Sequence, residues 1–123
     1  MLENEQLTEQ VIGAAIEVHR ILGPGLLESV YERCLSRELE MRGVAHQRQV
    51  LVPVIYKGQI IDCDLRMDIA LSGLVVELKS VEKILPIHEA QLLTYLKLSG
   101  NKVGLLLNFN VPKLRDGLKR MVN

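Results

Sequence analysis

The sequence predicts a single α/β domain, an α/β sandwich in which a small mixed sheet is flanked by helices in the order ααβββαβα. Three observations carry this prediction. Apolar residues recur at helical spacing in two segments near the N-terminus, an alternating run ends in a tight turn followed by a second apolar run, and residues 102–109 hold a continuous apolar stretch. With 123 residues, 48% of them hydrophobic, the chain is long enough to build one core.

Two helices are expected first, over residues 7–22 and 26–42. The turn Gly23-Pro24-Gly25 ends the first, and Gly43 ends the second. At about 100° per residue, Glu28 falls on the edge of the second helix's apolar stripe and can point along the packing surface. An alternative is an ordinary carboxylate in a first helical turn, which the helix dipole favours. The stripe itself consists of Leu27, Val30, Tyr31, Cys34 and Leu35.

Candidate functional residues lie in the predicted hairpin over residues 61–71 and 74–79. This hairpin follows an extended arm over 44–56. Residues 61–71 alternate, with Asp68 on the polar side, and Ser72-Gly73 is a natural hairpin turn. In the next strand, Glu77 and Lys79 share one face because side chains alternate along a strand. A carboxylate on each of two neighbouring antiparallel strands, with a lysine beside one of them, is a plausible divalent-metal site.

The remaining elements are a helix over 87–98, a strand over 102–109 and a closing helix over 112–122. The first helix presents Gln91 and Tyr95 on one stripe, one turn apart. The strand contains Leu105, Leu106 and Leu107 in succession, the pattern of a strand covered on both faces. Each candidate site residue also has an ordinary structural explanation when it is considered alone. Glu77 and Lys79 could form an ion pair, and Asp68 could be solvated. Gln91 and Tyr95 could be the flank of an amphipathic helix.

The formal net charge is zero, so the overall charge does not indicate a nucleic-acid or membrane partner. The distribution is uneven, since residues 97–123 carry six basic and one acidic side chain. These six are candidate phosphate contacts, although a solvated basic helix end explains them equally well. They are Lys97, Lys102, Lys113, Arg115, Lys119 and Arg120.

Several classes of protein are disfavoured by the sequence. Two cysteines, Cys34 and Cys63, are too few for a disulfide framework, and we expect both to be buried free thiols. The acidic, polar N-terminus is unlike a signal peptide, and no apolar run approaches membrane-spanning length, so a cytoplasmic protein without a membrane partner is expected. The sequence has no P-loop and no nucleophile elbow, and its histidines lack metal-ligand spacing.

Asp68, followed by Glu77-x-Lys79 and then by a helix bearing Gln91-x-x-x-Tyr95, resembles the PD-(D/E)XK nuclease superfamily, particularly its RecB-like branch. Gly25-x-x-Glu28 followed by Ser-Val-Tyr, together with HEAQLLTYLKLSG and LLLNFNVP, resembles the small bacterial group named GxxExxxR proteins. The likeness covers about residues 7 to 122. Four positions beyond Glu28, where the group's name expects arginine, this chain has Glu32 and then Arg33.

The resemblance implies a restriction-endonuclease-like fold and a metal-dependent nuclease that hydrolyses phosphodiester bonds in DNA, with RNA as the alternative substrate. Asp68 and Glu77 would bind Mg²⁺ or Mn²⁺, as would the backbone carbonyl of Leu78 and, directly or through water, Glu28. Hard oxygen ligands select these ions over zinc. Lys79 would position the attacking water or offset developing negative charge. Gln91 and Tyr95 would donate hydrogen bonds to the metal-bound water or to a phosphate.

Two rival functions fit the same sequence. One is a non-catalytic module that keeps the nuclease fold and binds nucleic acid or a partner protein. The other is a structural protein stabilised by a divalent ion. A domain of this size offers little surface to bind a duplex. A homodimer is therefore expected both for the nuclease and for the non-catalytic binding module.

Overall fold

The computed structural model describes residues 2–123, in which two helices are followed by five strands, a third helix and two further strands separated by a short 3₁₀ helix. They are α1 (Leu2–Leu22), α2 (Glu28–Met41), β1 (Gln47–Leu51), β2 (Val54–Tyr56), β3 (Gln59–Ile61), β4 (Arg66–Leu71), β5 (Leu74–Lys79), α3 (Pro86–Ser99), β6 (Val103–Asn108), the 3₁₀ helix η1 (Leu114–Gly117) and β7 (Leu118–Val122). In the described part of the chain, no helix has the length and apolar character needed to cross a membrane.

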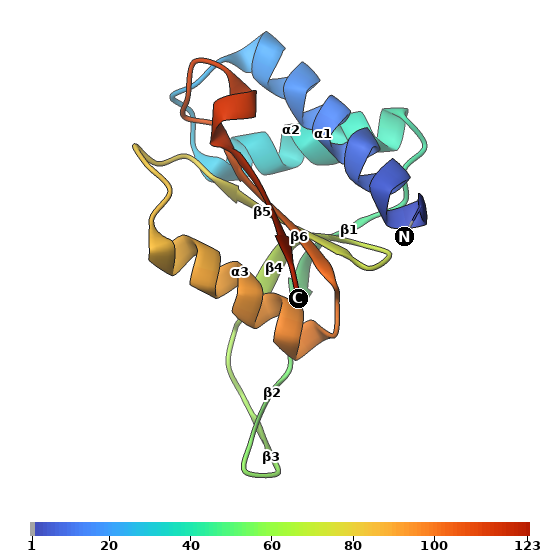
Figure 1. The fold of residues 1–123 in the computed structure, drawn as a ribbon, viewed down its shortest axis with the longest axis vertical. Coiled ribbons are helices and arrows are strands. Elements are labelled where there is room, and N and C mark those ends of the chain that lie inside the picture. Colours follow the sequence, from blue (N-terminus) through green and yellow to red (C-terminus); the bar gives the residue numbers. More distant parts are fainter. Residues whose placement is uncertain (1) are drawn as a thin grey trace.

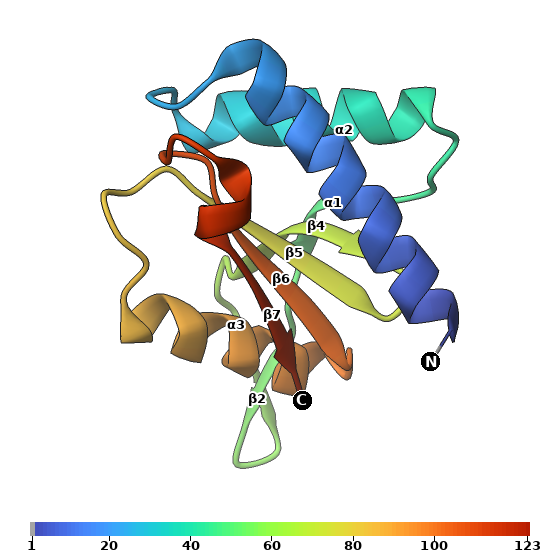
Figure 2. The same cartoon turned by 45° about the horizontal axis from the view of Figure 1, so that its top comes forward.

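Five strands form one mixed sheet in the order β1-β4-β5-β6-β7, and the helices lie on its two faces (Figures 1 and 2). Only β5 and β6 are parallel among these neighbours, and α3 makes the crossover between them. Helices α1 and α2 cover one face and α3 covers the other (Figure 2). The predicted mixed sheet flanked by helices is therefore confirmed.

Strands β2 and β3 form a separate antiparallel ribbon that projects away from the three layers (Figure 1). The ribbon divides what the sequence analysis treated as an arm over 44–56 and a strand over 61–71. Only Arg66–Leu71 of the second segment belongs to the main sheet. Cys63 lies in the connection to β4 and is exposed, so the prediction that both thiols are buried is wrong for this residue; Cys34 is half-buried.

The sheet separates two apolar clusters. The larger one joins α1 and α2 to one face of the sheet, and Tyr31 stacks on Phe109 within it with the ring centroids 4.4 Å apart. The smaller one joins Leu92, Tyr95 and Leu96 of α3 to the other face. In α2 the stripe is shifted from the predicted one, since Leu27 is 73% exposed whereas Leu39 is buried. This shift turns Glu32 and Ser36 inward.

The predicted closing helix over 112–122 is wrong. Residues Leu114–Gly117 make one short 3₁₀ turn, and Leu118–Val122 pair with β6 as an antiparallel edge strand. The apolar spacing of the segment suits a helix, but pairing with β6 satisfies main-chain groups that would otherwise lie unpaired at the sheet edge. Tertiary pairing has therefore overridden local periodicity.

Gly117 is the residue at which this turn is tightest. A Cβ atom placed there would overlap the main-chain carbonyl oxygen of Asn108, which cannot move without disturbing β6. We expect Gly117→Ala to lower the free energy of unfolding by roughly 3 kcal/mol, the upper end of overpacking costs. Urea unfolding measures the change. Gly13→Ala in α1 is the matched control, because its Cβ would meet only the flexible end of Arg42 and because alanine favours helix. Equal losses of unfolding free energy in the two variants would contradict this explanation.

Candidate active site

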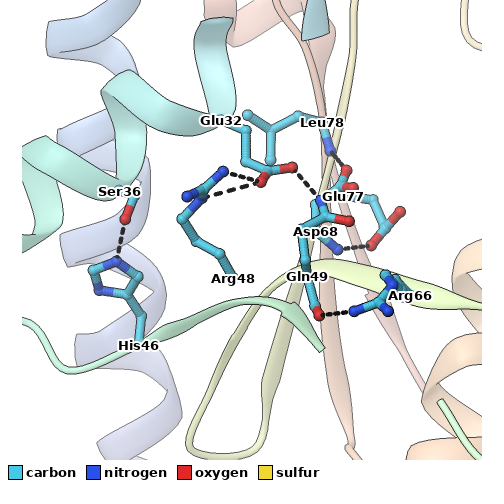
Figure 3. Close-up of polar contacts among 9 residues, drawn as sticks. All are labelled: Glu32, Ser36, His46, Arg48, Gln49, Arg66, Asp68, Glu77 and Leu78. Carbon is cyan, nitrogen blue, oxygen red and sulfur yellow. Dashed lines mark hydrogen bonds and ion pairs between the residues drawn. The ribbon is translucent and has the colours of Figure 1, made fainter. Parts of the chain in front are cut away.

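Asp68 and Glu77 lie side by side where β4 and β5 separate. The last paired residues there are Ile69 and Val76, so Asp68 and Glu77 come just beyond the regular ladder. Their carboxylates replace the missing main-chain bonds. The Asp68 amide donates to Glu77 Oε2 at 2.8 Å, and the Leu78 amide donates to Asp68 Oδ2 at 2.9 Å (Figure 3). This reciprocal arrangement fixes both carboxylates against the backbone.

Both carboxyl groups hold their protons more tightly than in water. Burial raises the pKa of Glu77 to about 8, and the negative charge of Asp68 adds to this effect. Burial likewise raises the pKa of Asp68 to about 6, against the lowering effect of its hydrogen bond from the Leu78 amide. Without a cation, the pair therefore resists carrying two negative charges near neutral pH.

A chain of polar side chains runs from β5 to α3. The Lys79 ammonium donates to Gln91 Oε1 at 3.4 Å, and Gln91 Nε2 donates to the Tyr95 hydroxyl at 3.1 Å. Burial raises the pKa of Tyr95, and the charges of Glu77 and Asp68 raise it further. Tyr95 therefore stays a neutral phenol near this pair. The structure thus brings together five of the residues that the sequence analysis singled out.

Glu28, at the start of α2, reaches the end of β5 by a different route. Its Oε2 accepts a hydrogen bond from the Ser80 amide at 3.2 Å, and the Ser80 hydroxyl donates to the carbonyl of Leu26 at 2.6 Å. The negative charge of Glu28 also contributes to the raised pKa of Asp68, as the smallest of its causes. Glu28 is thus tied to the same end of the sheet.

Asn108 anchors the loop that follows the site, a role that the sequence analysis missed. It is buried at the end of β6, where its amide group both accepts from the Val81 amide and donates to the Val81 carbonyl. Its neighbour across the parallel ladder is Lys79. The signal in the sequence was an asparagine directly after the apolar run Leu105–Leu107. An amide that is buried at the end of such a strand needs hydrogen-bond partners.

Glu32 is the second residue that was missed as a neighbour of the site. It is only 5% exposed, and its charge raises the pKa of both Asp68 and Glu77. Its carboxylate is held by Arg48 at 3.1 Å and by Gln49 at 2.7 Å (Figure 3). The spacing of four residues from Glu28, which places both on one helix face, could have pointed to it.

The donor set at the carboxylate pair fits a hard divalent cation. Among residues 2–123, no hydrogen-bond donor is assigned to Asp68 Oδ1 or Glu77 Oε1, and two desolvated carboxylates gain from a cation between them. Within the same residues, the side chains do not form a ready-made cluster of three or more histidine, cysteine, aspartate or glutamate ligands. Mg²⁺ commonly keeps several waters and takes one or two carboxylates from the protein.

The structure does not gather the six predicted phosphate contacts on one surface. Lys113 and Arg115 lie at η1, whereas Lys97 lies in the last turn of α3, at the opposite end of the sheet (Figures 1 and 2). Lys119 is engaged with Glu89 of α3 at 3.0 Å. Lys102 precedes β6, and Arg120 pairs with Leu105 in the β6–β7 ladder. The six basic residues are therefore spread from one end of the sheet to the other.

A family model described as the PD-(D/E)XK nuclease superfamily matches residues 5–121. The chain belongs to the PD-(D/E)XK nuclease superfamily. The mixed five-stranded sheet with flanking helices agrees with the restriction-endonuclease-like fold that this membership implies. The matched residues include the whole Asp68, Glu77 and Lys79 arrangement of this nuclease-superfamily domain. No curated protein and no solved structure matches the chain in the other two comparisons.

Proposed function

We propose that this nuclease-superfamily domain is an active, divalent-metal-dependent nuclease that hydrolyses phosphodiester bonds in DNA. One observation carries the proposal. Asp68 and Glu77 are locked together on neighbouring strands, desolvated and with raised pKa values, and Lys79 lies on the face of Glu77. Titratable groups perturbed in this way, next to a specific charge partner, are candidates for a functional site.

Asp68 and Glu77 are the residues that would hold Mg²⁺ or Mn²⁺, with the Leu78 carbonyl and Glu28 as further ligands. A bound ion supplies a water of lowered pKa and stabilises charge on the phosphate. Lys79 offsets negative charge that develops on the phosphate. Gln91 takes its orientation from Lys79 and Tyr95, and Tyr95 keeps a phenolic proton to donate. We further propose the RecB-like branch and the GxxExxxR group as the chain's place in the superfamily, and a homodimer as its working form.

The test of this proposal is cleavage of labelled single- and double-stranded DNA and RNA in Mg²⁺, Mn²⁺ or EDTA. Activity that requires the metal and disappears in Lys79→Ala supports a nuclease and identifies its substrate. Activity that survives in EDTA or in Lys79→Ala comes from a contaminant. Failure to cleave any of the four substrates would contradict the proposal and leave a binding module as the better account.

Lys113 and Arg115 are the basic residues best placed to bind DNA phosphates near the site. They follow β6 at the end of the sheet where Lys79 ends β5, because these strands are parallel and Lys79 pairs with Asn108. Replacing both by alanine should reduce the slope of log K against log salt by about 2, since each phosphate contact contributes about 0.9. Fluorescence anisotropy with labelled DNA measures the slope.

The comparison variant carries Lys97→Ala and Lys102→Ala, which remove the same charge at the other end of the sheet. We expect a smaller change in slope for this variant. Equal changes would show that the effect is one of overall charge, and no change in either variant would exclude this group of contacts.

A further inference from the structure

The backbone of β1 is distorted at the residue facing Asp68. Gln49 has φ = 52°, in the left-handed region that non-glycine residues rarely adopt. The β1–β4 register pairs Arg48 with Ile69 and Val50 with Met67, yet Gln49 and Asp68 between them are not paired. The ladder is therefore interrupted at one position, and that position is the metal-site aspartate.

The distortion has a clear structural support. Gln49 Nε2 donates to Glu32 Oε1 at 2.7 Å, and Arg48 holds Glu32 Oε2 at 3.1 Å. The Gln49 carbonyl, turned away from the ladder, accepts from Arg66 at 3.1 Å (Figure 3). Both the side chain and the main chain of Gln49 thus have hydrogen-bond partners in this conformation.

We propose that Glu32 is a positioning residue: by binding the Gln49 side chain, it holds β1 in the left-handed turn that leaves the Asp68 amide free for the Glu77 carboxylate. In a regular ladder, Gln49 would face Asp68 and compete for its main-chain groups. With β1 turned away, the Asp68 amide instead binds Glu77 Oε2. The catalytic consequence rests on the proposed nuclease function, whereas the structural one does not.

A simple ion pair does not explain this arrangement. Glu32 is nearly inaccessible, while Arg48 keeps 34% of its side chain exposed. A third carboxylate also repels the two at the site, which is unfavourable before a cation binds. The buried negative charge of Glu32 is explained if its carboxylate holds the Gln49 side chain, which an ion pair at the surface could not do.

The test uses the freedom of glycine to adopt positive φ without side-chain support. Gln49→Gly should keep the backbone turn, whereas Gln49→Val should lose it because a β-branched residue is strongly disfavoured there. Glu32→Gln leaves one acceptor oxygen for two donors, Arg48 and Gln49, and the charged Arg48 competes for it. This variant should therefore disturb the turn in the wild-type background and have a much smaller effect in the Gln49→Gly background. Glu38→Gln is the matched control, since Glu38 lies on α2 and also pairs with an arginine, Arg42 at 2.8 Å.

The readout independent of activity is hydrogen exchange at the Asp68 amide, measured by NMR. Exchange should be faster by on the order of tenfold in Glu32→Gln and Gln49→Val, and near wild type in Gln49→Gly and Glu38→Gln. If nuclease activity is found, kcat should fall in the same two variants by about tenfold with KM little changed, as misplacement of a reacting group predicts.

The proposal is overturned if Glu32→Gln leaves the Asp68 amide protected, or if its effect is the same size in the Gln49→Gly background. The second result would mean that Glu32 acts on the site by charge alone. Absence of cleavage in every protein, with the exchange pattern as expected, would reject the nuclease and leave the positioning role intact. Melting temperatures measured in parallel show whether any variant has lost its fold.

Discussion

Glu77→Gln is expected to abolish DNA cleavage while leaving the fold intact. The glutamine oxygen can still accept the hydrogen bond from the Asp68 amide, so β4 and β5 keep their spacing. What is lost is the negative charge that would hold the cation. Because a catalytic metal supplies several kcal/mol of transition-state stabilisation, the rate should fall by at least about a thousandfold.

The measurement is the initial rate of cleavage of the substrate that the wild type prefers. Glu89→Gln is the matched control, since Glu89 is a carboxylate on α3 whose partner is the surface Lys119. This control should retain nearly full activity, because exposed ion pairs contribute little. Undiminished cleavage by Glu77→Gln would exclude Glu77 as a metal ligand.

The same substitution is expected to stabilise the metal-free protein at alkaline pH. The pKa of Glu77 rises from 4.5 to about 8 on folding. The folded state therefore binds this proton more tightly than the unfolded state does. Stability from this group is fully present below pH 4.5 and is lost as the pH rises to about 8.

At pH 8 to 9, Glu77→Gln should exceed the wild type in free energy of unfolding by on the order of 3 kcal/mol, less than the full pKa shift implies because the strands can relax. At pH 4.5 the two proteins should be nearly equal. Urea unfolding in EDTA across this range measures both. A difference that does not change with pH would contradict the raised pKa, and adding Mn²⁺ should stabilise the wild type preferentially.

The sequence was most informative where local pattern and tertiary structure agree. Alternation over Ile69–Leu71 and the Ser72-Gly73 turn predicted the β4–β5 hairpin, and with it the proximity of Asp68 and Glu77. The alternation fails at Asp68 itself, because Met67 packs on the opposite face of the sheet from Ile69. Helical spacing predicted that Gln91 and Tyr95 share a face, and the structure adds a hydrogen bond between them and a second one from Lys79 to Gln91. Such features depend on residues close in sequence, where backbone geometry leaves few alternatives.

The C-terminal segment shows what local pattern cannot supply. Leu118–Val122 has apolar spacing compatible with a helix, but β6 offers an unpaired edge and Gly117 permits the close turn onto it. The ribbon of β2 and β3 is similar, since a continuous alternation does not reveal that the chain leaves the sheet and returns. In both places, partners distant in sequence decide the structure.

Local sequence pattern also gave only part of the environment of the site. The inward rotation of Glu32 follows from how α2 packs, and the left-handed backbone of Gln49 follows from its contact with Glu32. The basic residues of the C-terminal segment illustrate the reverse case. They are neighbours in sequence, but β6 runs along the sheet between Lys102 and Lys113 and so places these two residues near opposite ends of it (Figure 2).

Calorimetric titration with Mn²⁺ at pH 7 tests whether Asp68 and Glu77 hold a divalent cation. The raised pKa of Glu77 means that the cation must displace a proton, so repeating the titration in buffers of different ionisation enthalpy should reveal release of about one proton per ion bound. In Glu77→Gln, binding should weaken strongly and this proton release should vanish. Binding of equal affinity with the same proton release in the variant would contradict the claim.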